Sequence, residues 1–342
     1  MKGVVFLGDR QLEIRDFPDP TPGPGQVVVH MRASGLCGSD LRPYRSSAAE
    51  LGPRTSVICG HEPCGVVADI GTGVRNVGVG ARVMVHHYSG CGECKHCQTG
   101  WTQLCVGGSK VYGSHADGSN ADFELVEDYM CVPMPDGLSF EAGAACACGT
   151  GTAYQAVKRL EISGLDTLAV FGQGPVGLSA TFFGAVMGAR VVAVDPIVER
   201  RDLAKRLGAT ETIDPTVADP VAAVMELTQG EGADATLEAT GIHEVRANAV
   251  RSTRVWGRAC FVGEGGTVAL EPTPDIIHRQ LTLLGSWTFS TAILAELANF
   301  VVNRGLPLDD LITHRYSLAQ ADEAFMLFDS GRTGKPVFTW AN

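Results

Sequence analysis

A glycine-rich turn between an apolar strand and a helix is the feature that most restricts how this chain can fold. The stretch LAVFGQGPVGLSATFF places Gly172, Gly174 and Gly177 in a G-x-G-x-x-G pattern, after an apolar run and before a segment with helical spacing. The first glycine makes the turn, the second lets a pyrophosphate approach the backbone, and the third permits close packing of the helix. Pro175 suits the first helical turn, where its missing N–H costs nothing. The stretch predicts a dinucleotide-binding turn, the alternative being a glycine turn that binds no nucleotide.

An acidic residue follows the next apolar strand. Asp195 ends that strand about 20 residues after the first glycine, where a carboxylate accepts hydrogen bonds from ribose hydroxyls and repels a 2′-phosphate. NAD(H) is therefore favoured over NADP(H), although Arg200 and Arg201 lie close enough in sequence to weaken the preference. The residues predicted to contact the cofactor are Gly172, Gly174, Pro175, Val176, Gly177, Asp195, Arg200, Val262, Gly263 and Ser286. Val262, Gly263 and Ser286 follow later strands. The alternative for these three is that they are ordinary strand-end residues without a role in cofactor binding.

The pattern of the chain changes near residue 150. The first half predicts short strands separated by turns, at 2–8, 11–17, 26–33, 64–71, 81–88 and 121–135. A helical segment at 141–160 leads to apolar strands at 168–172, 190–195, 211–214, 234–241, 259–265 and 281–286, with helices at 176–188, 199–208, 221–230 and around 245–257. Continuously apolar strands separated by helices predict a doubly wound parallel sheet covered on both faces. The tail adds helices at 291–305 and 318–331 and a strand at 335–340 that returns to the first half.

Bulk properties exclude several classes of protein. The 342 residues suffice for about two domains. A net charge of −11 argues against binding to nucleic acid or to an anionic membrane. No apolar run approaches the roughly 18 residues of a transmembrane span, and Asp9 and Arg10 interrupt the N-terminal apolar run too early for a signal peptide. We expect a cytoplasmic protein, in which the 11 cysteines stay reduced and serve metal binding or catalysis.

Four closely spaced cysteines form the first metal signal. The segment CGECKHCQTGWTQLC has the spacing C-x2-C-x2-C-x7-C, which brings four thiolates to about 2.3 Å from one tetrahedral Zn²⁺. Four protein ligands leave no open position, so the site is predicted to stabilise a lobe and to do no chemistry. The alternative is a set of unpaired thiols in a glycine-rich loop. The predicted ligands are Cys91, Cys94, Cys97 and Cys105, and His96 is interpreted as a solvated side chain.

A metal that does chemistry needs a position left open for water or substrate. Candidate donors occur in three separate stretches that follow or precede apolar strands. Taken alone, a cysteine or histidine at such a position is more often a core residue or a histidine with ordinary hydrogen bonds. The candidates therefore indicate a metal site only in combination. The candidates are Cys37, Ser39 and Asp40 in LCGSD, His61 and Glu62 in GHEP, and Cys146 and Cys148 in CACGTGTAY.

Taken together, these pieces resemble the zinc-containing medium-chain alcohol and polyol dehydrogenase family over essentially the whole chain. The matching motifs are LCGSD at 36–40, GHEP at 60–63, the four-cysteine lobe, CGTGTAY at 148–154, GQGPVG at 172–177 and the terminal strand. The resemblance implies a mostly β GroES-like catalytic domain over 1–150 with a structural zinc lobe at about 88–108, and a Rossmann NAD-binding domain over 151–290. A segment over 291–342 would complete the first domain.

The resemblance also implies roles for individual residues. Cys37, His61 and Cys148 would hold a catalytic zinc ion, the second zinc of the chain, with Glu62 beside them as a neighbouring or transient ligand. Asp40 would orient His61, and Ser39 would hold the substrate hydroxyl and pass on its proton. Sorbitol-type members often carry a glutamate where Cys148 stands, so this ligand set resembles that of the simple alcohol dehydrogenases. Cys146, two residues before Cys148, is the less suitable zinc ligand of the two.

One position departs from the family pattern. Many relatives have a histidine three residues after the serine, where it continues a proton relay, and this chain has Arg42 instead. A guanidinium stays protonated and does not shuttle protons readily. Water, the ribose hydroxyls, His86 and His87 remain as alternative exit routes.

The sequence therefore predicts a zinc- and NAD(H)-dependent oxidoreductase that interconverts a secondary alcohol and its ketone by hydride transfer. A small polyol, sugar or cyclitol is the favoured substrate, and a simple alcohol or aldehyde or an L-threonine-type substrate is the alternative. A non-catalytic nucleotide-binding protein is the alternative from another class, whereas a zinc-free quinone reductase conflicts with both cysteine sets. A homodimer or homotetramer is expected.

Overall fold

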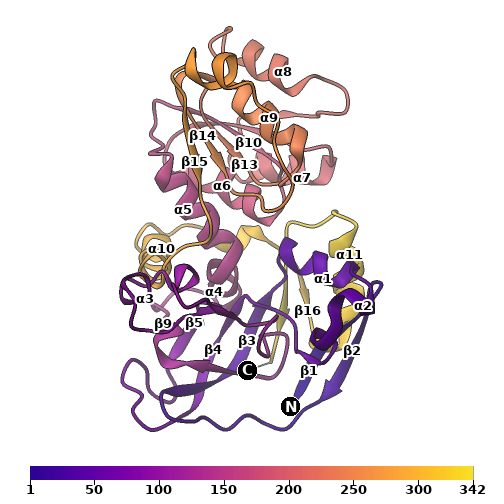
Figure 1. Cartoon of the computed structure of the whole chain (residues 1–342), viewed down its shortest axis with the longest axis vertical. Helices are drawn as coiled ribbons and strands as arrows, with labels where there is room; N and C mark the ends of the chain where they lie inside the picture. Colours follow the sequence, from indigo (N-terminus) through magenta and orange to yellow (C-terminus); the bar gives the residue numbers. More distant parts are fainter. Residues whose placement is uncertain (342) are drawn as a thin grey trace. The chain divides into compact units, whose positions relative to one another are not determined.

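The computed structural model describes residues 1–341 and divides into two compact units. The first unit comprises Met1–Gly151, Phe289–Ser330 and the chain from Lys335 onward, and the second comprises Thr152–Thr288 and Gly331–Gly334. The segment 291–342, which the sequence assigns whole to the first domain, thus gives four residues to the second unit. In Figure 1 the first unit combines the indigo N-terminal part of the chain with the yellow C-terminal part.

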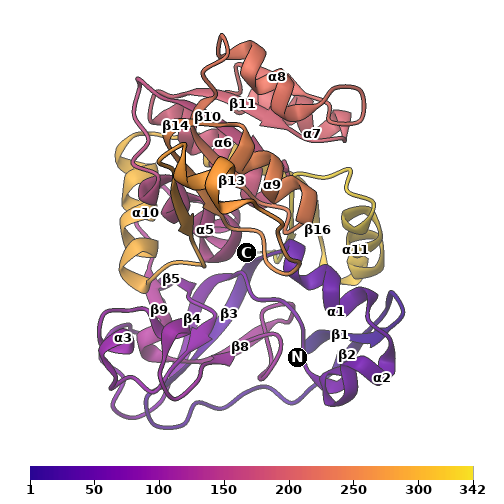
Figure 2. The same ribbon diagram turned by 45° about the horizontal axis from the view of Figure 1, so that its top comes forward.

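The first unit is built on a seven-stranded sheet, as the β-rich pattern of the N-terminal half predicts. Its strands are β3 (Gln26–Gly35), β4 (Pro63–Ile70), β5 (Arg82–Val85), β8 (Phe123–Glu127), β9 (Cys131–Pro133), β16 (Ile312–Tyr316) and β17 (Lys335–Thr339). They lie in the order β16, β17, β3, β4, β5, β9, and β8 pairs with the first part of β3. Figure 2 shows β3 with β4 and β8 on either side. Two smaller pairs join β1 (Lys2–Gly8) to β2 (Gln11–Asp16) and β6 (Tyr88–Ser89) to β7 (Lys110–Val111).

The helices of the first unit are short except near the C-terminus. They are α1 (Leu41–Arg45), α2 (Ala48–Leu51), α3 (Lys95–Gln98), α4 (Phe140–Ala145), α10 (Thr291–Asn303) and α11 (Ala321–Asp329). The single helix predicted at 141–160 is instead divided into α4, a π-helical stretch at Cys146–Thr150, and α5 (Gly151–Arg159). Glycines at 149 and 151 lower the helix propensity of this stretch. The division matters because the π-helical stretch carries Cys148.

Two strand predictions for the first unit need correction, and one strand of its large sheet was not predicted. The strand predicted at 121–135 is two strands, β8 and β9, separated by a 3₁₀ turn at Asp128–Met130. The backbone N–H of Asp128 still continues the β3–β8 register by donating to the carbonyl of Gly25 at 3.0 Å, and the turn begins at that residue. The strand predicted at 81–88 ends at Val85, and β16 was not predicted because His314 and Arg315 interrupt its apolar pattern.

The second unit is a six-stranded parallel sheet, as the alternation of strands and helices predicts. Its strands are β10 (Thr167–Phe171), β11 (Arg190–Val194), β12 (Glu211–Ile213), β13 (Ala233–Glu238), β14 (Thr253–Phe261) and β15 (Thr282–Gly285). They lie in the order β12, β11, β10, β13, β14, β15, and every pairing is parallel. Renumbered within the unit this order is 3-2-1-4-5-6, that of the Rossmann fold.

Four helices connect these strands: α6 (Pro175–Val186), α7 (Val198–Arg206), α8 (Pro220–Leu227) and α9 (His243–Arg251). Helix α6 packs against α7 and against strands β10 and β11, and α8 packs against α9. Because right-handed crossovers run outward in both directions from β10, the two helix pairs cover opposite faces of the sheet. None of the helices in residues 1–341 is long and apolar enough to span a membrane.

The helix predicted around 245–257 is wrong in its second half. Helix α9 ends at Arg251, and β14 begins two residues later at Thr253. The stretch Thr253–Trp256 is β-branched or aromatic at three of its four positions, which favours a strand. The register with β13 is irregular because residues 254–257 of β14 bulge between the pairs Ala233–Thr253 and Ala235–Arg258, and Trp256 in this bulge has a positive φ of 61°.

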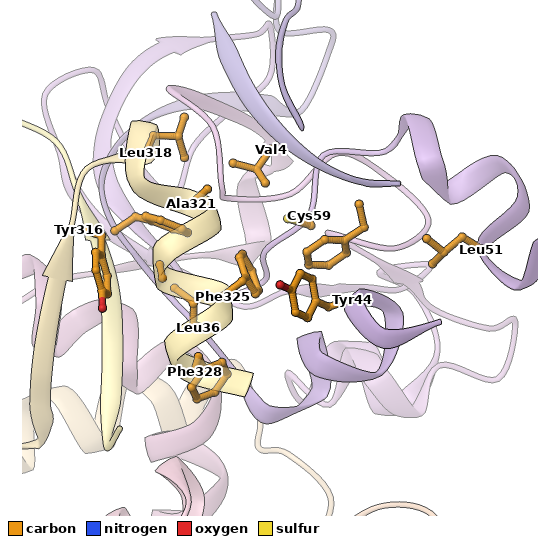
Figure 3. Packing of buried hydrophobic residues seen from close by; sticks show 13 residues of the cluster. Val4, Leu36, Tyr44, Leu51, Cys59, Tyr316, Leu318, Ala321, Phe325 and Phe328 are labelled. Carbon is orange, nitrogen blue, oxygen red and sulfur yellow. The ribbon is translucent and has the colours of Figure 1, made fainter. Parts of the chain in front are cut away.

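An aromatic cluster joins the two ends of the chain within the first unit. Phe325 of α11 is fully buried, and its ring lies 5.0 Å from that of Phe6 in β1 and 5.3 Å from that of Tyr44 in α1. Figure 3 shows the Phe325 side chain pointing from α11 towards Tyr44. The ring of Phe338 in β17 lies 6.3 Å away. The C-terminal helix and strand are therefore part of the core of the N-terminal half.

We predict that Phe325→Ala lowers the free energy of unfolding by about 3–5 kcal/mol, because it opens a cavity among buried rings. The neighbouring Met326 is 66% exposed on the same helix, so Met326→Ala serves as a matched control with a change within about 0.5 kcal/mol. Chemical denaturation of both variants measures the difference. Equal losses in the two variants would show that this cluster does not hold the C-terminal helix.

Candidate functional site

Three separate parts of the first unit bring four metal-binding side chains together. Cys37 follows the end of β3, His61 and Glu62 immediately precede β4, and Cys148 lies in the π-helical stretch after α4. One donor atom from each lies within 4.8 Å of the others. Cys37, Glu62 and Cys148 are buried, and His61 is partly exposed. The antiparallel pairing of β3 with β4 explains why the chain segments at 37 and 61 meet.

Asp40 fixes the orientation of the histidine in this cluster. Its carboxylate lies 2.8 Å from Nδ1 of His61 and also accepts the backbone N–H of Cys37 at 2.9 Å. A proton on Nδ1 leaves the lone pair on Nε2, the atom that faces the other donors. The Ser39 hydroxyl lies 3.1 Å from this Nε2 and 3.3 Å from Sγ of Cys37. Ser39 therefore stands directly at the cluster, where the sequence predicted it.

The donor set and its spacing fit a zinc ion. Two sulfurs bound to one tetrahedral zinc at about 2.3 Å lie about 3.8 Å apart, and Sγ of Cys37 lies 3.9 Å from Sγ of Cys148. The contact between the two sulfurs lowers the pKa of the Cys37 thiol well below its usual value and raises the pKa of the Cys148 thiol well above it, so the pair by itself favours one thiolate, at Cys37, of the two that a zinc ion would bind. Cys146 is fully buried but is absent from the cluster. Cys37, His61, Cys148 and Glu62 could hold the metal.

Lys335 is a residue of this region that the sequence analysis missed. It begins β17, its side chain is 3% exposed, and its ammonium pairs with the carboxylate of Glu62. It also donates to the carbonyl of Leu36 at 3.0 Å. Burial disfavours its charged form, but the Glu62 carboxylate outweighs burial and raises the pKa of Lys335. A lysine at the start of an apolar terminal strand was the available signal, and its partner was not visible in the sequence.

The second metal cluster is the four-cysteine lobe. Sγ of Cys97 lies 3.5 Å from Sγ of Cys94 and 4.0 Å from Sγ of Cys91. Backbone N–H groups of Cys91 and Cys94 donate to the sulfurs of Cys105 and Cys91, each at 3.3 Å. Gly90 is required here, because a Cβ at that position would lie 2.5 Å from Sγ of Cys97. The structure brings all four predicted thiols together in a closed set that suits a structural zinc ion.

His86 and His87, both considered as proton exits, are buried. Nε2 of His86 lies 2.9 Å from the carbonyl of Phe289, and its Nδ1 lies 3.3 Å from the hydroxyl of Thr102. Burial lowers the pKa of His86 to about 4. Both nitrogens of His86 thus serve internal hydrogen bonds. The ring centroid of His87 lies 4.9 Å from that of His61.

The glycine-rich turn of the second unit has the shape that its sequence predicts. Gly172 follows β10 with a φ of 88°, and Gly174 caps the N-terminus of α6. A Cβ on Gly177 would lie 1.7 Å from the carbonyl oxygen of Gly172, whereas a Cβ on Gly174 would meet no atom within 4 Å. Gly177 is therefore needed for helix packing, and Gly174 leaves open space above the helix N-terminus, as a pyrophosphate requires. Pro175 and Val176 form the first turn of α6.

Asp195 follows β11 and ties the glycine-rich turn to that strand. Its two carboxylate oxygens accept the backbone N–H groups of Gln173 at 2.7 Å and Ile197 at 2.8 Å. The guanidinium of Arg200 lies 3.9 Å from the same carboxylate. Arg201 is used differently, because it binds the carbonyl of Asp195 and pairs with Asp214. Arg200 is thus the arginine beside the predicted ribose site.

The remaining predicted cofactor residues lie at the carboxyl ends of the next two strands. Val262 and Gly263 follow β14 and donate their N–H groups to the carbonyl of Glu238 at 2.9 and 3.0 Å. Ser286 follows β15, and its buried hydroxyl has no hydrogen-bond partner among the described residues. Parallel strands share one carboxyl edge, so these residues and the glycine-rich turn line the same edge of the sheet.

Comparisons with known proteins agree with this architecture. Residues 23–136 match the family model of the alcohol dehydrogenase GroES-like domain, and residues 175–303 match that of zinc-binding dehydrogenases. The chain belongs to the zinc-binding alcohol dehydrogenase family. This confirms the predicted resemblance and the predicted pairing of a GroES-like domain with a Rossmann domain.

Individual relatives match over nearly the whole length. A zinc-type alcohol dehydrogenase-like protein of Escherichia coli (strain K12) is 38% identical, with 99% of each chain covered. L-threonine 3-dehydrogenase of Pyrococcus horikoshii is 33% identical, with 95% of this chain and 94% of that protein covered. The structure of alcohol dehydrogenase TADH from Thermus sp. ATN1 superposes with a TM-score of 0.90 at 27% identity, with 99% of each chain covered.

We predict that Lys335→Met lowers the free energy of unfolding by about 3–5 kcal/mol, because it leaves the buried Glu62 carboxylate without its opposite charge, with only the backbone N–H of Gly149 at 3.3 Å still donating to it. The double variant Glu62→Gln with Lys335→Met is expected to lose less. Lys110 pairs with Glu127 but is 40% exposed, so Lys110→Met is a matched control with a loss of at most about 1 kcal/mol. Chemical denaturation measures the free energy of unfolding of the three variants. If the double variant is as unstable as Lys335→Met alone, the loss does not come from an unpaired Glu62 carboxylate.

Proposed function

We propose that the protein is a zinc-dependent alcohol dehydrogenase that uses NAD(H) to interconvert a secondary alcohol and its ketone. The observation that carries the proposal is the open donor cluster of Cys37, His61, Glu62 and Cys148, with the Ser39 hydroxyl beside it. A Rossmann sheet with an open glycine-rich turn supports the nucleotide part of the proposal. Membership of the zinc-binding alcohol dehydrogenase family supports the reaction class.

The chain's own residues have distinct tasks in this reaction. A zinc ion held by this donor set would supply the Lewis acidity that lowers the pKa of an alcohol, and a bound nicotinamide would supply the hydride acceptor. Asp40 holds the proton on Nδ1 of His61, so that Nε2 keeps its lone pair. Ser39 Oγ accepts the hydroxyl proton of the substrate and donates its own onward. The alcohol thus loses one proton and one hydride, which balances its oxidation to the ketone.

Asp195 supports a preference for NAD(H) over NADP(H). Its carboxylate stands at the end of β11, where the ribose of a dinucleotide lies in Rossmann folds. Arg200 lies beside it and offers a positive charge that tolerates a 2′-phosphate, which reduces the strictness of the preference. Neither Arg42, which stays charged, nor His86, whose nitrogens are both engaged, provides the onward route for the proton. Of the exit routes considered from the sequence, water, the ribose hydroxyls and His87 remain for Ser39.

The favoured substrate is a small polyol, sugar or cyclitol. L-threonine is the second candidate, because a relative that is 33% identical is an L-threonine 3-dehydrogenase. A simple alcohol or aldehyde is a further alternative, which Cys148 at the third ligand position supports. A non-catalytic nucleotide-binding protein would not require Ser39, Asp40 and the donor cluster to meet in one place. The homodimer or homotetramer expected from the sequence stays a prediction.

We predict that the purified protein contains about two zinc ions per chain and that Cys148→Ser reduces the content to about one. Cys146 is equally buried two residues away but lies outside the donor cluster, so Cys146→Ser is the matched control and should keep both ions. Elemental analysis of the three proteins measures the result. Full zinc content in Cys148→Ser would remove this cysteine from the site.

We further predict NADH formation with polyhydroxylated secondary alcohols, measured at 340 nm on a panel of polyols, sugars, cyclitols, L-threonine and simple alcohols. The rate with NADP should be lower, because the Asp195 carboxylate repels a 2′-phosphate. Ser39→Ala should reduce kcat by about 100-fold or more, as expected for loss of a proton-transfer group, while NADH binding stays unchanged. Two zinc ions and NADH binding without turnover on any member of the panel would support the non-catalytic alternative.

A further inference from the structure

Arg246 in the second unit is a buried charge to which the proposed reaction gives no task. It lies in α9, which packs against β13 and β14, and its side chain is 11% exposed. Its Nε lies 3.5 Å from a carboxylate oxygen of Glu238, the last residue of β13, whose side chain is fully buried. A buried carboxylate is tolerated only with a compensating charge or donors close by. The pair therefore places two buried charges at the carboxyl end of β13.

Glu238 fixes the loop that follows β13. Its Oε1 accepts the backbone N–H of Thr240 at 2.5 Å and that of Gly241 at 2.8 Å. Its backbone carbonyl accepts the N–H groups of Val262 and Gly263, which follow β14. This one residue thus binds the loop after β13 through its side chain and the loop after β14 through its backbone.

Arg246 fixes the loop that follows β14. Its guanidinium donates to the carbonyl of Gly263 at 2.6 Å and to that of Thr267 at 3.5 Å, and it lies 5.8 Å from the ring centroid of Phe261. The stretch GEGGT at 263–267 contains three glycines, which leave an unsupported backbone with unusual conformational freedom. Because Arg246 contacts both ends of this stretch, it restricts that freedom.

The two loops also pack directly against each other. A Cβ on Gly263 would lie 2.1 Å from the backbone nitrogen of Gly241, and a Cβ on Gly241 would lie 2.1 Å from the carbonyl oxygen of Glu264. The backbones therefore touch without room for a side chain, and a shift of one loop displaces the other. Glu238 and Arg246 hold the two loops as a single body.

The position of these loops indicates which part of a dinucleotide they serve. A Rossmann sheet consists of two mononucleotide-binding halves, and its ligands bind outside the carboxyl ends of the strands. Strands β10 and β11 are followed by the glycine-rich turn and by Asp195, which assigns the adenosine and the pyrophosphate to that half. Strands β13 and β14 belong to the other half. The loops after them therefore lie at the end of the sheet that receives the nicotinamide riboside.

We propose that Arg246, paired with Glu238, is a positioning residue for the nicotinamide half of the cofactor and acts through the loops after β13 and β14. This inference rests on the NAD(H) part of the proposed function and adds a residue to it. A loop that is held in its bound conformation does not have to be ordered when the ligand arrives, so the ligand binds more tightly. Loss of Arg246 should therefore weaken binding of the nicotinamide half and spare the adenosine half.

The test measures the dissociation constant of NADH by fluorescence titration and that of ADP by calorimetry. ADP carries the adenosine and the pyrophosphate of the cofactor but lacks the nicotinamide riboside. We expect Arg246→Met to raise the NADH constant by about 10-fold, as for the loss of charge-assisted hydrogen bonds, and to change the ADP constant by less than about twofold. Arg246→Lys keeps the charge but replaces the planar fork by one nitrogen, so its NADH constant should rise less.

Arg254→Met is the matched control. Nε of Arg254 lies 2.5 Å from a carboxylate oxygen of Asp234, and these two residues stand near the amino ends of β14 and β13. The control thus removes a similar ion pair from the opposite end of the same strands, and both dissociation constants should stay unchanged. Hydrogen exchange of the free protein adds a measurement without cofactor. Arg246→Met should speed exchange in the peptides that cover 240–242 and 262–267, and Arg254→Met should not.

The outcomes separate this inference from the proposed function. An unchanged NADH constant in Arg246→Met, an equal rise for NADH and ADP, or unchanged exchange in both loops would overturn the role of Arg246 and leave the proposed function intact. If Arg246→Met does not fold, Arg246→Lys decides by the same comparison. NADH binding without turnover of any alcohol would contradict the dehydrogenase activity, whereas a selective rise of the NADH constant would still support the inference. A wild-type protein that binds ADP but not NADH would overturn both.

Discussion

The buried ion pair between Lys335 and Glu62 connects the last strand of the chain to the donor cluster. Lys335 is held in β17, which pairs antiparallel with the end of β3, and Cys37 follows that same end. Glu62 stands immediately before β4, on the other side of β3. A buried charge is tolerated only with a partner close by. The cluster therefore keeps its arrangement only when the C-terminal strand is in place, and the aromatic contacts of Phe325 help to hold that end of the chain.

The first unit contains two clusters of thiols, and their arrangement suits one to a structural metal ion and the other to a catalytic metal ion. The lobe of Cys91, Cys94, Cys97 and Cys105 comes from one short segment and offers four sulfurs to one ion. The other cluster collects Cys37, His61 and Cys148 from three separate parts of the chain and adds a carboxylate that is already engaged by Lys335. With Cys37, His61 and Cys148 as the three protein ligands, a tetrahedral metal ion would keep its fourth coordination position open. The hydroxyl of Ser39 lies beside this cluster. Only the second arrangement has room for a substrate.

Much of this architecture follows from local patterns. The glycine spacing around Gly172 specifies a turn with a positive φ and a close helix contact, because a Cβ at Gly177 would overlap the Gly172 carbonyl. Continuous apolar runs separated by helices specify a parallel sheet. Local patterns failed at two places. A 3₁₀ turn at Asp128–Met130 separates β8 from β9, and β14 begins directly after the C-cap of α9, with Thr253 and then Arg258–Phe261 paired with β13.

The sequence by itself determined the fold class, the four-cysteine lobe and the candidate donors, because each depends on residue types at short spacings. Only the tertiary structure decided which distant groups meet. It brings Cys148 but not Cys146 into the donor cluster. It also uses both nitrogens of His86 in internal hydrogen bonds and pairs Lys335 with Glu62. It places Nδ1 of His87 3.3 Å from the carbonyl oxygen of Ala147. These pairings join residues that are far apart in the chain, and they depend on strand register and burial, which no short sequence pattern records.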